Sequence, residues 1–205
     1  MPGARRETPM AGLLIAFEGL DQSGKETQAR LLADWLHGFG HRLRIVAFPD
    51  DSTPIGQEIR RALAGGREYP PDVMQLLYVA NRYERRPDLL RWLGEGEIVL
   101  CDRYAASSVA YGAAQGLDAA WLGDIQRFLP DPALTLLLDI APETAAARKA
   151  SGRDRYERDL ALLARVRDSY RQQAGGRGWK RIDGERSREE VWGDVVSAVR
   201  ALLPR

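Results

Sequence analysis

The sequence has 205 residues, 44% of them hydrophobic, which is enough to fill the core of one domain between a sheet and its helices. Thirty basic and twenty-nine acidic side chains leave a formal net charge of +1, so overall charge favours neither nucleic acid nor an anionic membrane as a partner. The single cysteine, Cys101, excludes an intrachain disulfide framework and is typical of a reducing cytoplasm, and no segment approaches the roughly 18 apolar residues of a membrane span.

The chain opens with ten residues that contain Arg5 and Arg6 but no apolar region of signal-peptide type. We expect a disordered tail over residues 1–10 and a single domain over residues 11–205. The apolar run 13–17 predicts a strand, and the periodic pattern 29–36 predicts a helix.

Between this strand and helix lies the pattern G-x-x-x-x-G-K, which is typical of a loop that binds the phosphates of a nucleotide. In such a loop the glycines turn backbone N–H groups inward, the helix N-terminus adds positive charge, and the lysine neutralises the β- and γ-phosphates. We therefore expect an ATP site made by Gly19, Leu20, Asp21, Gln22, Ser23, Gly24, Lys25, Glu26 and Thr27.

Glu26 departs from the motif, which usually has a serine or threonine whose hydroxyl ligates Mg²⁺. Two interpretations stay open. Glu26 can ligate Mg²⁺ itself, with Thr27 supplying a nearby hydroxyl, or it can be a first-turn acid that the helix dipole favours.

Further along the chain, apolar patterns predict strands that alternate with helices, and this order predicts a parallel α/β/α sandwich. We expect the long helix that opens at Pro70-Pro71 to be interrupted near Pro87, because proline removes a backbone hydrogen bond. The predicted strands are 43–48, 97–101, 134–140 and 179–182; the predicted helices are 55–63, 71–93, one that starts at Pro142, 160–170 and 191–203.

Several polar residues are placed where a ligand would contact them. Asp102 and Arg103 follow a strand at its carboxyl end, where open parallel sheets bind ligands, although the two could be a structural ion pair. Tyr78 and Arg82 are four residues apart and share one helical face, although Tyr78 could pack in the core and Arg82 could be a solvated charge. The basic segment of about 148–157 predicts a lid beside the phosphate loop.

Four separated stretches resemble the thymidylate kinases, a family of P-loop nucleoside monophosphate kinases, over residues 11–203. They are the segment 17–21 that leads into the loop, the segment 49–56, Ala80-Asn81-Arg82, and Asp102-Arg103-Tyr104 with Val109-Ala110-Tyr111-Gly112; Arg153 with Tyr156-Glu157 adds to them. The resemblance implies a five-stranded parallel sheet with a short helical lid, ATP and Mg²⁺ as cofactors, a homodimer, and conversion of dTMP to dTDP.

The resemblance also implies roles for individual residues. Lys25, Asp102, Arg103 and Arg153 would be catalytic, Glu26 and Asp102 would hold the metal, and Arg148 would lie beside the adenine. The acceptor dTMP would be bound by Asp21, Pro49, Tyr78, Arg82, Arg103, Tyr111 and Tyr156, although Tyr111 could simply pack. Asp51 stands where some members of the family carry an arginine for the acceptor phosphate.

Two other functions remain open at this point. Asp51 motivates a kinase for another deoxynucleotide or deoxynucleoside, and Glu26 and Asp51 together motivate a nucleotide-binding protein with reduced turnover. In each case we expect a cytoplasmic protein whose partners are small molecules, with no nucleic acid and no membrane.

Overall fold

The computed structural model describes residues 12–148 and 159–203. It contains five parallel strands in the order β2-β3-β1-β4-β5, which confirms the predicted α/β class and the five-stranded sheet. The strands are β1 (Leu13–Glu18), β2 (Leu43–Ala47), β3 (Ile98–Asp102), β4 (Leu134–Asp139) and β5 (Trp179–Asp183). The predicted tail, and most of the predicted lid, lie outside the described residues.

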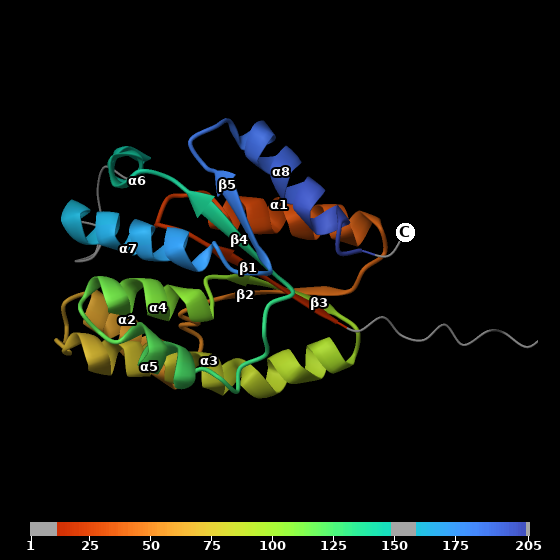
Figure 1. Cartoon of the computed structure of the whole chain (residues 1–205). Helices are drawn as coiled ribbons and strands as arrows, with labels where there is room; N and C mark the ends of the chain where they lie inside the picture. Colours follow the sequence, from red (N-terminus) through yellow and green to blue (C-terminus); the bar gives the residue numbers. More distant parts are fainter. Residues whose placement is uncertain (1–11, 149–158, 204–205) are drawn as a thin grey trace, which may run out of the picture.

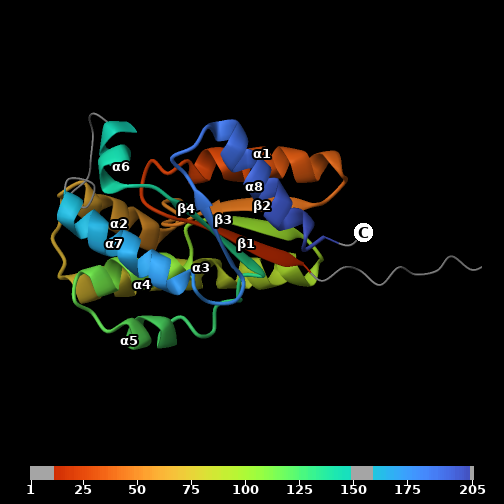
Figure 2. The same ribbon diagram turned by 45° about the horizontal axis from the view of Figure 1, so that its top comes forward.

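Helices cover both faces of this sheet (Figure 1). The described helices are α1 (Lys25–Gly38), α2 (Pro54–Leu63), α3 (Pro71–Gly94), α4 (Ala105–Ala114), α5 (Ala119–Asp124), α6 (Pro142–Arg148), α7 (Leu160–Gln173) and α8 (Arg188–Arg200). Helices α1 and α8 lie together on one face, and α3, α4 and α7 lie on the other, as the turned view also shows (Figure 2).

The two faces follow from the alternation of side chains along each strand. In β1, Ile15 and Phe17 pack with α1 and α8, whereas Leu14 and Ala16 pack on the side of α3. Because both faces are covered, β1 and β4 read as nearly continuous apolar runs. Cys101 is a buried, free cysteine in β3.

The order of the strands places the phosphate loop at a switch point of the sheet. The chain leaves β1 toward β2 and β3 on one side and later passes to β4 and β5 on the other. Ligands of open α/β sheets bind outside the carboxyl ends of strands at such a point. The loop after β1 and the residues after β3 therefore meet at one edge of the sheet.

The prediction of an interruption near Pro87 is wrong, because α3 runs through that proline to Gly94. A proline inside a helix costs about 3 kcal/mol or more. Here the buried face of α3 continues on both sides of Pro87, with Val79 before it and Leu89 after it, both at most 4% exposed. Packing of that face against the sheet offsets the local cost.

Candidate active site

The phosphate loop joins β1 to α1 and has the backbone geometry that the motif predicts. Gly19 and Gly24 have φ angles of 137° and 93°, in the left-handed region that favours glycine. A Cβ atom on Gly19 would lie 2.4 Å from the carbonyl oxygen of Leu138, so the position also has no room for a side chain. A third loop residue with such a backbone is Gln22, at φ 64°.

Lys25 is the first residue of α1 and is buried, with 6% of its surface exposed. Its Nζ donates to the carbonyl oxygens of Leu20 and Gly19, at 2.7 and 3.2 Å. Burial and the charge of Arg103 lower the pKa of the ammonium to about 8, although Asp102 and Asp21 partly oppose this shift. The lysine is thus a cation with little solvation at the base of the loop.

A cavity of about 480 Å³ opens above this loop. Arg148 lies at its wall, where Nη1 donates to the carbonyl oxygen of Gln22 at 3.1 Å and Nη2 to that of Gly184 at 2.9 Å. The other lining residues include Asp21, Ser23, Gly24, Lys25, Glu26, Thr27, Phe48, Asp102, Arg103, Arg186 and Arg188. We name this space the loop cavity.

A second cavity, of about 120 Å³, lies beside it and is lined by residues from α2, α3 and α4. Tyr78 and Arg82 both line it, so their shared helical face is confirmed. Arg82 is buried and donates from Nη1 to Ser108 Oγ at 2.8 Å and to Gln126 Oε1 at 3.1 Å. The remaining lining residues are Asp21, Phe48, Pro49, Leu63, Gln75, Arg103, Ser107, Ser108 and Tyr111; we name this space the side cavity.

Arg103 and Asp21 stand where the two cavities meet, because both residues line both spaces. Arg103 Nη2 donates to Asp21 Oδ1 at 2.7 Å, and its guanidinium lies 5.3 Å from the centre of the Tyr111 ring. Burial would raise the pKa of the Asp21 carboxyl, but the charges of Arg103 and Lys25 outweigh it and hold that pKa well below its usual range. Asp21 is therefore ionised at neutral pH.

Asp102 ends β3 and lines the loop cavity. Its Oδ1 is buried and has no hydrogen-bond partner among the described residues. A buried carboxylate oxygen without a donor is suited to a cation or an ordered water. The alternative of an Asp102 and Arg103 ion pair is not borne out, since Arg103 pairs with Asp21 instead.

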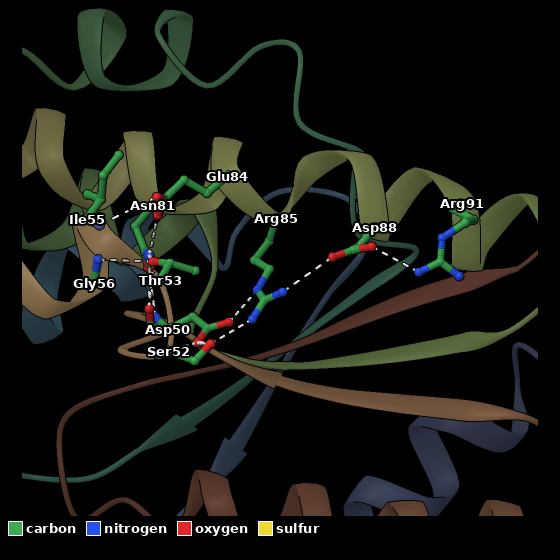
Figure 3. Close-up of polar contacts among 10 residues, drawn as sticks. All are labelled: Asp50, Ser52, Thr53, Ile55, Gly56, Asn81, Glu84, Arg85, Asp88 and Arg91. Atoms are coloured by element: carbon green, nitrogen blue, oxygen red, sulfur yellow. Dashed lines mark hydrogen bonds and ion pairs between the residues drawn. The ribbon is translucent and has the colours of Figure 1, made fainter.

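The loop after β2 forms one wall of the side cavity, and α3 holds it in place (Figure 3). Asn81 accepts from the N–H of Asp50 at 2.8 Å and donates to Thr53 Oγ1 at 2.8 Å, while Arg85 pairs with Asp50 and donates to Ser52 Oγ at 2.7 Å. These contacts fix the chain that follows Phe48 and Pro49, which themselves line the cavity.

The two departures from the family pattern both have partners of their own. Glu26 lines the loop cavity, but its Oε1 is 2.6 Å from Arg30 Nη2 on the same helix, and the Glu26 side chain is 70% exposed. Asp51 pairs with Arg60 at 2.9 Å and lines neither cavity. Arg153 and Tyr156 lie outside the described residues.

Sequence reasoning missed several residues of these walls. Gln75, Ser107 and Ser108 line the side cavity, and Gly184, Arg186 and Arg188 line the loop cavity. Ser107 and Ser108 follow Asp-Arg-Tyr closely, which could have pointed to them, whereas nothing local distinguishes Gln75 or the residues after β5. Helices α4 and α5 were likewise not predicted.

The sequence was compared with protein families and with known proteins. The family model for thymidylate kinase matches residues 17–195. The chain belongs to the thymidylate kinase family. It is 39% identical to a thymidylate kinase of Arabidopsis thaliana over 92% of this chain and 72% of that protein, and 35% identical to that of Homo sapiens over 90% and 88%.

A solved structure shares the fold as well. The thymidylate kinase of Candida albicans, described as having broad substrate specificity, superposes with a TM-score of 0.80 at 29% identity and covers 94% of this chain and 92% of that one. Membership of the thymidylate kinase family thus rests on sequence and on fold.

Proposed function

We propose that this protein transfers the γ-phosphoryl group of ATP to the phosphate of dTMP, giving dTDP and ADP. Family membership supports the reaction class and the acceptor. The observation that carries the proposal is the junction of the two cavities at Asp21 and Arg103, because phosphoryl transfer requires donor and acceptor phosphates to meet.

The loop cavity would bind the donor. Backbone N–H groups of residues 19–27 and the Lys25 ammonium would hold the ATP phosphates, and Arg148 would lie toward the adenine side. The Lys25 ammonium is buried, and its partners are the neutral carbonyl oxygens of Gly19 and Leu20. A bound phosphate would give the ammonium a partner with full negative charge, which supports this role. For Arg153 we keep the role of closing over the transferred group, which rests on the family resemblance alone.

The side cavity would bind dTMP. Tyr78 would stack on the thymine, Arg82 would face the base edge, and Asp21 would accept a hydrogen bond from the sugar 3′-hydroxyl. Pro49 and Tyr111 would complete the walls around the base and the sugar. Arg103 would bind the acceptor phosphate, and Tyr156, outside the described residues, is proposed to face the sugar.

Mg²⁺ suits the residues around Asp102. The described residues contain no group of three or more acidic, histidine or cysteine side chains that could hold a metal. That is compatible with Mg²⁺ beside a nucleotide, which uses one or two protein oxygens with phosphates and waters. Asp102, with its unpartnered Oδ1, would be the main protein ligand, and Thr27 would add a hydroxyl; Glu26 is engaged by Arg30. When bound, the ion would neutralise phosphate charge.

The chemistry asks the protein to align and to stabilise rather than to form a covalent intermediate. Lys25 would stabilise charge on the transferring group from the donor side, and Arg103 would orient the attacking oxygen from the acceptor side. Lys25 is the first residue of α1, and Arg103 directly follows β3, so regular elements position both cations. Such preorganised charges contribute most where water is excluded.

The decisive experiment is an ADP-release assay with ATP and Mg²⁺ and a panel of acceptors: dTMP, dUMP, dGMP and thymidine. We expect turnover that depends on dTMP and is at least tenfold slower with dGMP. The broad specificity described for the Candida albicans relative is the reason to include a purine acceptor. ATP binding without ADP release in the presence of any acceptor would refute the proposal.

We further propose a homodimer, a cytoplasmic location and a single domain over residues 11–205. Leu76 and Leu90 are exposed on α3, about four turns apart on one side, and support a subunit contact through that helix. The location is supported by the free, buried Cys101; separately, no described helix is long and apolar enough to cross a bilayer. Sedimentation velocity would test the dimer.

A further inference from the structure

Glu18, the last residue of β1, has a fully buried carboxylate and lines neither cavity. Its Oε1 accepts from the backbone N–H groups of Tyr104 and Ser107, at 2.9 and 3.2 Å. Its Oε2 accepts from Ser107 Oγ at 2.6 Å and from Tyr170 Oη at 2.9 Å. Burial raises the pKa of this carboxyl, and the four donors, together with the charge of Arg103, oppose that rise.

The same two hydroxyl groups are partners of Arg103. Arg103 Nη1 donates to Ser107 Oγ and to Tyr170 Oη, each at 3.3 Å, while Nη2 is held by Asp21. The two hydroxyl oxygens lie 2.8 Å apart. The guanidinium is thus held on two sides, directly by one carboxylate and through two hydroxyl groups by another.

The direction of these hydrogen bonds depends on Glu18. Each hydroxyl group has one proton, whereas an ionised carboxylate can only accept. Glu18 therefore draws the protons of Ser107 and Tyr170 toward itself, and their lone pairs are left to face Arg103. A second carboxylate in direct contact with Arg103 would compete with a phosphate for its charge, while hydroxyl groups fix its position and leave that charge available.

We propose that Glu18 is a positioning residue for the acceptor phosphate: it orients the hydroxyl groups of Ser107 and Tyr170 so that they hold Arg103 where the two cavities meet. This inference rests on the proposed function, in which Arg103 binds the phosphate of dTMP. Glu18 itself contacts no substrate.

The test is Glu18→Gln, which keeps size and shape but turns one acceptor into a donor. With the amide oxygen on the backbone N–H groups, the amide nitrogen donates to the hydroxyl groups, and their protons turn toward Arg103. Calorimetry should then give about tenfold weaker binding of dTMP, while thymidine, which has no phosphate, binds within about twofold of wild type. The KM for ATP should not change.

Two comparisons separate positioning from a general structural role. Glu97→Gln alters another buried carboxylate, which pairs with Arg44 at 2.7 Å and lines neither cavity, and should leave both affinities unchanged. In an Arg103→Ala background, Glu18→Gln should cause no further loss of dTMP affinity. Additive losses, or equal weakening of dTMP and thymidine, would overturn the inference.

Tyr170→Phe provides a second test if Glu18→Gln does not fold, because it removes one of the two hydroxyl groups between Glu18 and Arg103. It should also weaken dTMP more than thymidine, and an unchanged ratio of the two affinities would overturn the inference. The proposed function fails separately, if the wild-type protein itself does not prefer dTMP to thymidine.

Discussion

Because the ammonium of Lys25 is buried, the ligand-free protein should become more stable as pH rises above about 8. Its pKa is 10.5 in the unfolded chain and about 8 in the folded one. Below pH 8 both states carry the proton, and above pH 10.5 neither does. Between these values the unfolded state binds more protons, so the free energy of unfolding rises as pH increases.

The expected size follows from this difference in pKa. From pH 7 to pH 9.5, deprotonation of Lys25 in the folded state alone should add about 2 kcal/mol to the free energy of unfolding. For a domain of this size, that corresponds to a rise of roughly 4 to 8 °C in Tm. Lys25→Met keeps most of the side-chain volume and removes the titrating group, so it should lose this increment.

Urea denaturation at pH 7 and pH 9.5 measures the effect for wild type and Lys25→Met. Other titrating groups act on both proteins and cancel in the difference between them. Lys180→Met, which changes an exposed lysine of β5, is the matched control and should follow the wild type. Parallel pH profiles for wild type and Lys25→Met would refute a poorly solvated ammonium at this position.

Three other outcomes follow from the site. Arg103→Ala should lower kcat with dTMP at least about 100-fold, because a charge that positions the acceptor is lost, and a rate near wild type would contradict the acceptor assignment. Tyr78→Ala should raise the KM for dTMP about tenfold and leave that for ATP unchanged, whereas a change for ATP alone would place Tyr78 elsewhere. Asp102→Asn should raise the Mg²⁺ concentration needed for half-maximal turnover about tenfold or more. Glu26→Gln should leave that concentration within about twofold of wild type, because Arg30 already engages Glu26. The reverse result would assign the metal to Glu26.

The sequence by itself determined the phosphate loop and most of the strands and helices around it. Local chemistry is sufficient there, because glycine spacing, one lysine and the change from strand to helix periodicity act within a few residues. The helix predicted over 55–63 lies within α2, and residues adjacent to its start, Thr53 as the cap and Pro54 in the first turn, account for where it begins. The pair Tyr78 and Arg82 was predictable for the same reason, since helical spacing alone places both on one face.

Only the tertiary structure decided which side chains from distant segments meet. Arg103 pairs with Asp21 across 82 positions of sequence, and Glu18 reaches Tyr170 across 152, contacts that depend on the order of strands β3, β1 and β4. Packing likewise keeps α3 helical through Pro87, although proline disfavours the interior of a helix. Local pattern specifies elements, but hydrogen bonds between elements depend on burial and strand order, which no short stretch of sequence encodes.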